Sequence, residues 1–137
     1  VGIDETQSFF SFGNKSNKEH REIRDEIREG FTELSKLGPA VGIWVIFATQ
    51  QVRESTIPTD VAANAVIRYA LKLEGWEPND RILGTGSYKN GIDATMFDFA
   101  DKGIGILKAE GMRAEIARSV FGLDAPTARK VAERCRR

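Results

Sequence analysis

The stretch AVGIWVIFATQ, residues 40–50, decides the fold class of this chain. It is a short apolar run rich in β-branched and aromatic residues, and it ends in the polar residues Thr49 and Gln50. An apolar run without polar alternation is typical of a strand buried on both faces, as in a parallel sheet covered by helices. We therefore predict a buried strand here, with Trp44 in the core.

A helix is predicted before this strand and another strand before the helix. Between about Lys18 and Leu37 apolar residues recur at spacings of four and three, which places them on one helical face. Gly38–Pro39 then ends the helix. The apolar segment Val1–Asp4 is interpreted as the end of a buried strand. Strand, helix and strand in this order predict a βαβ unit with parallel pairing.

The rest of the chain is predicted to continue the α/β pattern. A second buried strand is expected at AVIRYALKL, residues 65–73, after a short helix around Pro58–Asn64. Residues 74–93 are rich in Gly, Asn, Asp and Pro and are expected to be largely loop, with one helical turn near Asn79–Leu83. The predicted C-terminal elements are a hairpin of ATMFDF (94–99) with GIGILKA (103–109), a further strand in AEIARSVF (114–121) and a terminal helix capped by Asp124.

Composition limits the classes of protein to which the chain can belong. Its 137 residues suit one domain, and 20 basic against 20 acidic residues give no overall attraction for nucleic acid or anionic lipid. A single cysteine, Cys135, and a single histidine, His20, argue against a disulfide framework and a zinc site. No apolar run is long enough to span a bilayer, so we expect a cytoplasmic segment without direct membrane contact. Because a strand-like segment starts at Val1, we expect the chain to be part of a longer protein.

Polar residues follow both N-terminal strands at the point where each ends. Asp4 and Glu5 follow the first strand, and Thr49 and Gln50 follow the second. Ligands of open parallel sheets bind at the carboxyl ends of the strands. In phosphoryl transfer an Asp holds Mg²⁺, a neighbouring carboxylate orients water, and an amide contacts the γ-phosphate. Each signal alone also fits a helix cap or a solvated turn, but the two together favour a phosphoryl-transfer site.

Several longer segments resemble one family of motor proteins. LSKLGPAVGIWVIFATQ (34–50) and IPTDVAANAVIRYALKL (57–73) resemble the C-terminal half of the motor domain in the FtsK/SpoIIIE family of double-stranded DNA translocases. NDRILGTGSYKNGIDATMF (79–97) and DKGIGIL (101–107) are closest to FtsK-like proteins of actinobacterial plasmids and mobile elements. The resemblance extends from Val1 to about Ala132.

The resemblance implies a fold, ligands and partners. The expected fold is α/β, the C-terminal half of a three-layer RecA-like P-loop NTPase core, with a mostly parallel sheet, helices on both faces and a C-terminal β-hairpin. Residues 1–137 would form a single partial domain that lacks the phosphate-loop half. The implied cofactors are ATP and Mg²⁺. The implied partners are double-stranded DNA, further copies in a homo-hexamer and the upstream half of the same motor domain.

Carried over by position, the resemblance also assigns roles to residues. Asp4 becomes the Walker B ligand of Mg²⁺, Glu5 the catalytic glutamate and Gln50 the amide that senses the γ-phosphate, with Thr49 beside it. These four residues would bind the nucleotide.

A ring-shaped motor is expected to have an arginine finger, and here the chain departs from the family pattern. Pro39 occupies a position where many members have Arg, and the usual ATQ-R-P continues here as Gln50-Gln51-Val52-Arg53. Arg53 and Arg68 are the candidate substitutes, and Arg68 also fits a strand-end cap or a partner of a carboxylate at the edge of the core.

The loop Gly84–Gly91 carries Tyr88 and Lys89 at its tip. Backbone amides, a hydroxyl and an ammonium group can contact DNA phosphates without reading bases. The loop equally fits a surface turn whose Gly and Asn residues adopt positive φ, with Tyr88 packed on the sheet. It equally fits a segment that lines the nucleotide site or the subunit interface.

The sequence thus predicts part of an ATP-driven double-stranded DNA translocase, serving chromosome segregation or conjugative plasmid transfer. The resemblance also allows a parent protein anchored at the inner face of the cell membrane. On its own the chain is expected to be inactive as an ATPase. The alternatives are a type VII secretion ATPase of the same superfamily and a non-catalytic interaction module that has lost the phosphate loop.

Overall fold

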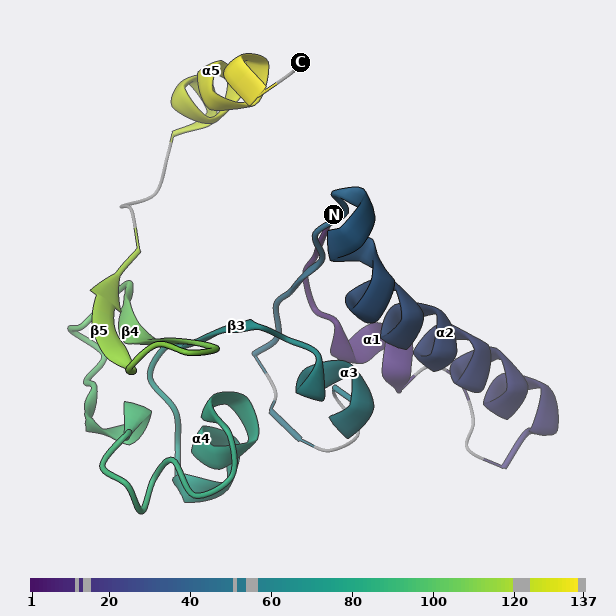
Figure 1. The fold of residues 1–137 in the computed structure, drawn as a ribbon, viewed down its shortest axis with the longest axis horizontal. Coiled ribbons are helices and arrows are strands. Elements are labelled where there is room, and N and C mark those ends of the chain that lie inside the picture. The colour runs from purple at the N-terminus through teal and green to yellow at the C-terminus, as the bar shows by residue number, and fades with distance from the viewer. Residues whose placement is uncertain (12, 14–15, 51, 54–56, 120–123, 136–137) are drawn as a thin grey trace.

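The computed structural model describes the 137-residue chain except for residues 12, 14–15, 51, 54–56, 120–123 and 136–137. Its described part is a mixed α/β structure with two separate sheets, one parallel and one antiparallel (Figure 1). None of the helices in the described ranges has the length and apolar character needed to cross a bilayer.

The parallel sheet consists of β1 (Gly2–Ile3) and β2 (Ile46–Phe47), with Gly2 opposite Ile46 and Ile3 opposite Phe47. The connection contains α1 (Gln7–Phe10), α2 (Lys18–Leu37) and the 3₁₀ helix η1 (Gly38–Val41). The predicted helix at 18–37 and the predicted βαβ unit are therefore confirmed.

Aromatic side chains pack α1, α2 and β2 together. The ring of Phe31 in α2 makes edge contacts with Phe10 in α1 and with Phe47 in β2, at centroid distances of 5.7 and 5.5 Å. Phe9 lies at 6.1 Å from the same ring. Edge-to-face pairs of this kind stabilise a core beyond the apolar area that they bury. Phe31 thus holds the long helix against the end of β2.

The prediction of a strand buried on both faces between 41 and 48 is wrong. Within this run the strand is limited to Ile46–Phe47, and Ile46 and Trp44 remain 67% and 62% exposed. Among the described residues β1 is the partner strand of β2, and the side of β2 that carries Ile46 is open to solvent. The run is apolar, as the sequence shows, but no described element packs on the exposed side of β2. Parallel strands are normally covered by helices on both faces.

The antiparallel sheet has the order β3 (Ile67–Ala70), β4 (Ile104–Ala109) and β5 (Glu115–Arg118). The prediction of a mostly parallel sheet is therefore wrong, because the second apolar strand pairs antiparallel with β4. The C-terminal hairpin is confirmed, but β4 and β5 form it. Residues 94–99 do not form its first strand, since η2 (Ala94–Met96) is a 3₁₀ helix that starts at the side-chain cap of Asp93.

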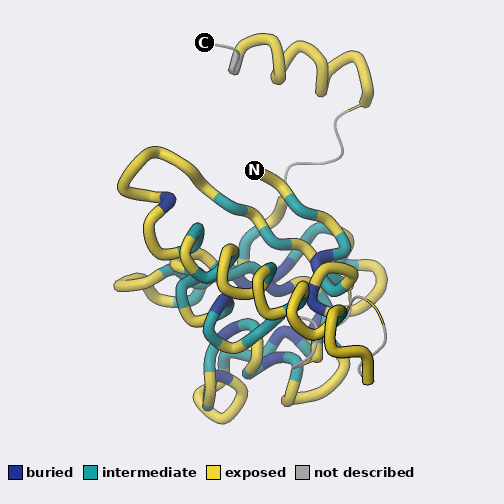
Figure 2. Tube along the Cα trace, turned by 90° about the vertical axis from the view of Figure 1, so that its right-hand side faces the viewer, coloured by how far each residue is buried: buried dark blue, intermediate teal, exposed yellow. Residues whose placement is uncertain are grey.

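Three further helices complete the described chain. α3 (Thr59–Ala63) agrees with the predicted short helix. α4 (Trp76–Leu83) contains the helical turn predicted near Asn79–Leu83, but it starts earlier, in a region expected to be loop. α5 (Ala125–Cys135) begins at Asp124, whose carboxylate accepts a hydrogen bond from the Thr127 amide at 2.9 Å, as predicted. In Figures 1 and 2, α5 lies apart from both sheets.

The core lies between the antiparallel sheet and α4. Leu83 of α4 is fully buried and packs with side chains from β3, β4 and the segment after α4. The buried members of this cluster are Ala70, Leu83, Ala94, Phe97 and Ile106. Figure 2 shows that α2, by contrast, is mostly exposed along its length. The folded core therefore belongs mainly to the C-terminal half of the chain.

Candidate functional site

The carboxyl ends of β1 and β2 lie at the same edge of the parallel sheet, as the sequence predicts. The amide of Thr6 donates to the carbonyl of Ala48 at 3.0 Å, and the Thr6 hydroxyl donates to the same carbonyl at 2.9 Å. Thr6 is completely buried, which makes these bonds stronger than exposed ones. Thr6 thus fixes the segment after β1 to the segment after β2, and brings Asp4–Glu5 and Thr49–Gln50 to one place.

Gln7 connects two of the predicted site residues through its side chain. Its amide nitrogen Nε2 donates to the carboxylate of Glu5, and its carbonyl oxygen Oε1 accepts from the Thr49 hydroxyl at 2.6 Å. The amide of Gln7 is therefore oriented by an acceptor on one side and a donor on the other. Sequence reasoning missed this residue, although it stands two positions after Glu5. Gln7 could have been found from its position, because it is a polar residue at the start of a helix that follows a strand end.

The backbone turns sharply at the acidic pair. Glu5 has φ of +51°, and among the described residues it is the one that adopts positive φ without being a glycine. The left-handed conformation costs an L-residue with a Cβ roughly 1–2 kcal/mol. The carboxylate of Asp4 partly offsets this cost by accepting from the Glu5 amide at 2.9 Å. Strain of this kind is typical of functional sites, where the position of a side chain matters more than its local energy.

The chemistry of the acidic pair fits a nucleotide-bound Mg²⁺ better than a protein-only metal site. No group of three metal-ligating side chains occurs within the described ranges. Mg²⁺, however, usually takes one or two carboxylates and completes its shell with water and substrate phosphates. Asp4 is exposed and uses one carboxylate oxygen for the Glu5 amide. Its other oxygen is suited to that kind of shell.

The remaining predicted residues lie in two different places. Gln50 and Arg53 are exposed after β2. Arg68, in β3, is half-buried and bonds to carbonyl oxygens at the ends of two helices: Nε and Nη2 donate to Ala65 and Ala62 at 3.1 Å each, and Nη1 donates to Ile82 at 3.4 Å. Arg68 thus caps α3 and α4. The finger role of Arg53 and Arg68 stays a prediction.

Asp80 shapes the loop that carries Tyr88 and Lys89. Its carboxylate accepts from the amides of Gly86 and Tyr88, both at 2.7 Å. The hydrogen bond from the Tyr88 amide is the main reason that the pKa of Asp80 is lowered, and the Gly86 amide and Lys89 act in the same direction. The side chains of Tyr88 and Lys89 are exposed at the surface of this turn. The predicted DNA contact has the exposure that it requires, and it stays a prediction.

Asn79 holds the far end of the same loop. This side chain is completely buried, donates to the carbonyl of Ile92 and accepts from the amide of Ala94, at 2.8 Å each. Asn79 and Asp80 are neighbours in α4, so one helix positions both ends of the loop. Sequence reasoning placed Asn79 at a helical turn and gave it no role.

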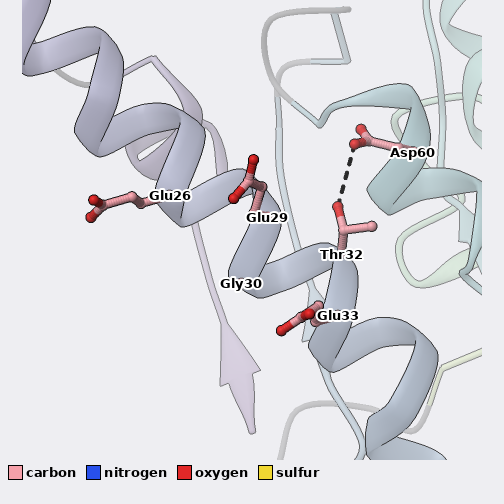
Figure 3. Close-up of a pocket in the computed structure, with 6 residues that line it drawn as sticks. All are labelled: Glu26, Glu29, Gly30, Thr32, Glu33 and Asp60. Carbon is pink, nitrogen blue, oxygen red and sulfur yellow. Dashed lines mark hydrogen bonds between the residues drawn. The ribbon is translucent and has the colours of Figure 1, made fainter.

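A second polar feature lies between α2 and α3 (Figure 3). Asp60 accepts from Nε of Arg28 at 2.9 Å, and the Thr32 hydroxyl lies at 3.4 Å from the same carboxylate. An open hollow of about 420 Å³ lies beside them, lined by Glu26, Glu29, Gly30, Thr32, Glu33 and Asp60. Its carboxylates repel anions, so this hollow does not fit a phosphate ligand.

Comparisons with known proteins add one likeness in fold. No protein-family model matches the chain, and no curated protein matches it in sequence. Among solved structures, the chain is similar to the conjugation coupling protein TcpA of pCW3, in a monomer form with ATPγS. The TM-score is 0.74, the sequence identity is 18%, and the match covers 97% of this chain but 36% of that chain. The chain therefore shares the fold of a segment that makes up about a third of that protein.

Proposed function

We propose that this chain is the C-terminal half of a RecA-like motor domain of the FtsK/SpoIIIE type, from a protein that moves double-stranded DNA during conjugative transfer. The observation that carries the proposal is the parallel pairing of β1 with β2, which brings Asp4, Glu5, Thr49 and Gln50 to one sheet edge. The fold likeness to a conjugation coupling protein with ATPγS supports it.

In this proposal each residue at the strand ends has one task. Asp4 holds Mg²⁺, which supplies charge neutralisation of the phosphates when it is bound. Glu5 accepts a hydrogen bond from the attacking water and orients it, and Gln7 holds the carboxylate of Glu5 in place. Gln50 donates to the γ-phosphate, while Thr49 is oriented by Gln7. This division of work is the usual one in phosphoryl transfer, where positioning and electrostatics dominate.

The proposal extends to the parts that the described residues lack. The phosphate loop and the remaining strands of a three-layer core would come from the upstream half of the motor domain. These strands would cover the exposed apolar residues of β2. The complete protein would act as a homo-hexamer around DNA, with Arg53 or Arg68 reaching the nucleotide of the neighbouring subunit.

The first experiment uses the longer protein that contains this segment. Glu5→Gln should leave ATPγS binding within about twofold of the unsubstituted protein and lower ATP turnover at least ~100-fold, because it removes the carboxylate and keeps the shape. Glu19→Gln, an exposed position on α2, is the matched control and should change neither quantity. Equal loss of binding and turnover in Glu5→Gln would argue against the role of Glu5.

A second experiment separates DNA transport from protein secretion. Turnover of the longer protein should rise when double-stranded DNA is added and should not respond to secreted peptides. The 137-residue chain alone should hydrolyse ATP no faster than its Glu5→Gln variant. Stimulation by peptide and not by DNA would favour a type VII secretion ATPase, and robust turnover by the chain alone would contradict the proposed division of the domain.

A further inference from the structure

Two half-buried cations lie side by side next to the C-terminal end of α4. Arg68 in β3 and Lys108 in β4 are direct partners in the antiparallel register. Like charges in that relationship repel each other and destabilise a sheet. No carboxylate of the described residues lies within ion-pair distance of either side chain. The carboxylate of Asp80 in α4 accepts hydrogen bonds from the backbone amides of Gly86 and Tyr88.

Carbonyl oxygens of α4 stabilise the two cations only in part. Lys108 Nζ donates to the carbonyl of Leu83 and to the Ser87 hydroxyl, the latter at 3.2 Å, and Arg68 Nη1 donates to the carbonyl of Ile82 at 3.4 Å. A helix C-terminus carries about half a negative charge, against two full positive charges here. The hydrogen bonds described use two of the three ammonium N–H groups and three of the five guanidinium N–H groups. Charged donors are therefore left over.

Both cationic side chains lie beside Gly84. A Cβ atom at Gly84 would lie 3.4 Å from Lys108 Nζ, 3.6 Å from Arg68 Nη1 and 3.9 Å from Ser87 Oγ. Glycine is required there in any case, because φ is +100°. The groups around Gly84 are an ammonium, a guanidinium and the hydroxyl of Ser87. Ser87 is 3% exposed, and its hydroxyl donates to the carbonyl of Leu83 at 2.8 Å.

We propose that Arg68 and Lys108 bind the oxygen atoms of a phosphate group beside Gly84, with Ser87 orienting the ammonium. Guanidinium and ammonium groups together suit a phosphate, which accepts several charge-assisted hydrogen bonds at once. The phosphate belongs either to a nucleotide or to the backbone of DNA, since both present the same oxygens. The inference rests on this geometry, and it shares Arg68 with the arginine-finger role in the proposed function.

The test follows the Gly84 and Ser87 amide signals of the ¹⁵N-labelled 137-residue chain by NMR. Inorganic phosphate is added against chloride at constant ionic strength. Both signals should shift saturably, and Lys108→Gln should weaken the apparent affinity at least ~10-fold, because one charge-assisted hydrogen bond is lost. Lys102→Gln makes the same charge change at an exposed position and should leave the affinity unchanged. Lys108→Arg should restore most of the binding.

Further variants keep the test decisive if Lys108→Gln does not fold. Ser87→Ala keeps both charges and should weaken phosphate binding several-fold by freeing the ammonium. A lack of saturable shifts in the unsubstituted chain, or equal weakening by Lys102→Gln, would overturn the site. ATPγS and a short DNA duplex are then added as competitors at equal phosphate concentration. Displacement by the first assigns the site to a nucleotide and displacement by the second to DNA, whereas displacement by neither would overturn the assignment to a phosphate ester.

Discussion

The hydroxyl of Thr49 donates to the side-chain carbonyl of Gln7 at 2.6 Å, across 42 positions of the chain. Gln7 in turn donates to the carboxylate of Glu5. Gln7, which belongs to neither strand, therefore connects the residues that follow β1 with those that follow β2. The side-chain amide of Gln7 links the Thr49 hydroxyl to the Glu5 carboxylate by two hydrogen bonds.

The first prediction measures this link by a double-mutant cycle. Gln7→Ala and Thr49→Val should each lower the free energy of unfolding of the chain, and their effects should be non-additive by about 1 kcal/mol, the usual net value of one such hydrogen bond. Chemical denaturation provides the four values. Gln7→Ala combined with Thr59→Val, an exposed position in α3, is the control pair and should be additive. Additivity in both pairs would mean that the Gln7–Thr49 bond carries no energy.

The second prediction concerns the left-handed backbone of Glu5. Glu5→Gly should give a chain that is about 1 kcal/mol more stable than Glu5→Ala, because glycine has no Cβ to clash at φ of +51°. At Glu33, in the C-terminal part of α2, the same comparison should have the opposite sign by about 1 kcal/mol, since glycine weakens helices. Thermal unfolding of the four variants checks both signs. The same sign at both positions would refute the left-handed geometry.

The third prediction is a pH dependence at Asp60. The hydrogen bond from Arg28 is the main cause that lowers the pKa of Asp60 below its ordinary value of 3.8. A carboxyl with a lowered folded-state pKa stabilises the protein above the ordinary value, and loses that contribution as the pH falls through the lowered one. Asp60→Asn should therefore cost about 0.5–1 kcal/mol at pH 7, as partly exposed ion pairs do, and almost nothing near pH 2. Glu22→Gln, in the exposed pair with Lys18, should show a smaller difference.

The fourth prediction concerns the buried amide of Asn79. Asn79→Ala removes partners from the carbonyl of Ile92 and the amide of Ala94, and should lower the free energy of unfolding by about 2–4 kcal/mol. The Ala94 amide is left buried, and the half-buried Ile92 carbonyl also loses its hydrogen bond. Asn90→Ala changes the same residue type at an exposed position of the loop and should cost less than about 0.5 kcal/mol. Similar losses at both positions would argue against a stabilising role of the two Asn79 hydrogen bonds.

The fifth prediction tests the loop as a DNA contact in the proposed longer protein. Lys89→Ala should weaken binding to unrelated duplex sequences by a similar factor, and should reduce the slope of log affinity against log salt by about 1, because one phosphate contact is lost. Lys18→Ala, an exposed position at the start of α2, should leave the slope unchanged. Fluorescence anisotropy at several salt concentrations supplies the slopes. An unchanged slope for Lys89→Ala would remove the loop from the DNA-binding surface.

Sequence patterns predicted the elements whose signals are local. The spacing of apolar residues indicated α2, and Asp124 indicated the start of α5, because periodicity and side-chain capping depend on neighbouring residues. The grouping of Asp4–Glu5 with Thr49–Gln50 was also predictable, since parallel strands place their carboxyl ends at one edge. The structure confirms that grouping in space, although the chemical roles remain proposals.

Long-range pairing was not predictable in the same way. An apolar run such as residues 65–73 is compatible with both a parallel and an antiparallel partner strand. The pairing of β3 with β4 depends on contacts between segments that are far apart in the chain. The turn predicted near Asn79–Leu83 is confirmed as the end of α4. The start of α4 at Trp76 was missed because Gly75 and Pro78 weigh against a helix, whereas the buried side chains of Asn79 and Leu83 favour it through tertiary contacts. Gln7, Asn79 and Lys108 have roles that only the folded arrangement reveals.

The exposed apolar side of β2 has a practical consequence for the chain in solution. Within the described residues, β1 and β2 each pair along one edge, so each leaves an open row of backbone donors and acceptors. Open edges next to apolar side chains such as Trp44 and Ile46 are sites of intermolecular strand pairing. Concentrated samples of the isolated chain are therefore prone to aggregate through this edge, and the order in which a longer protein is synthesised and folded would decide how long the edge stays open.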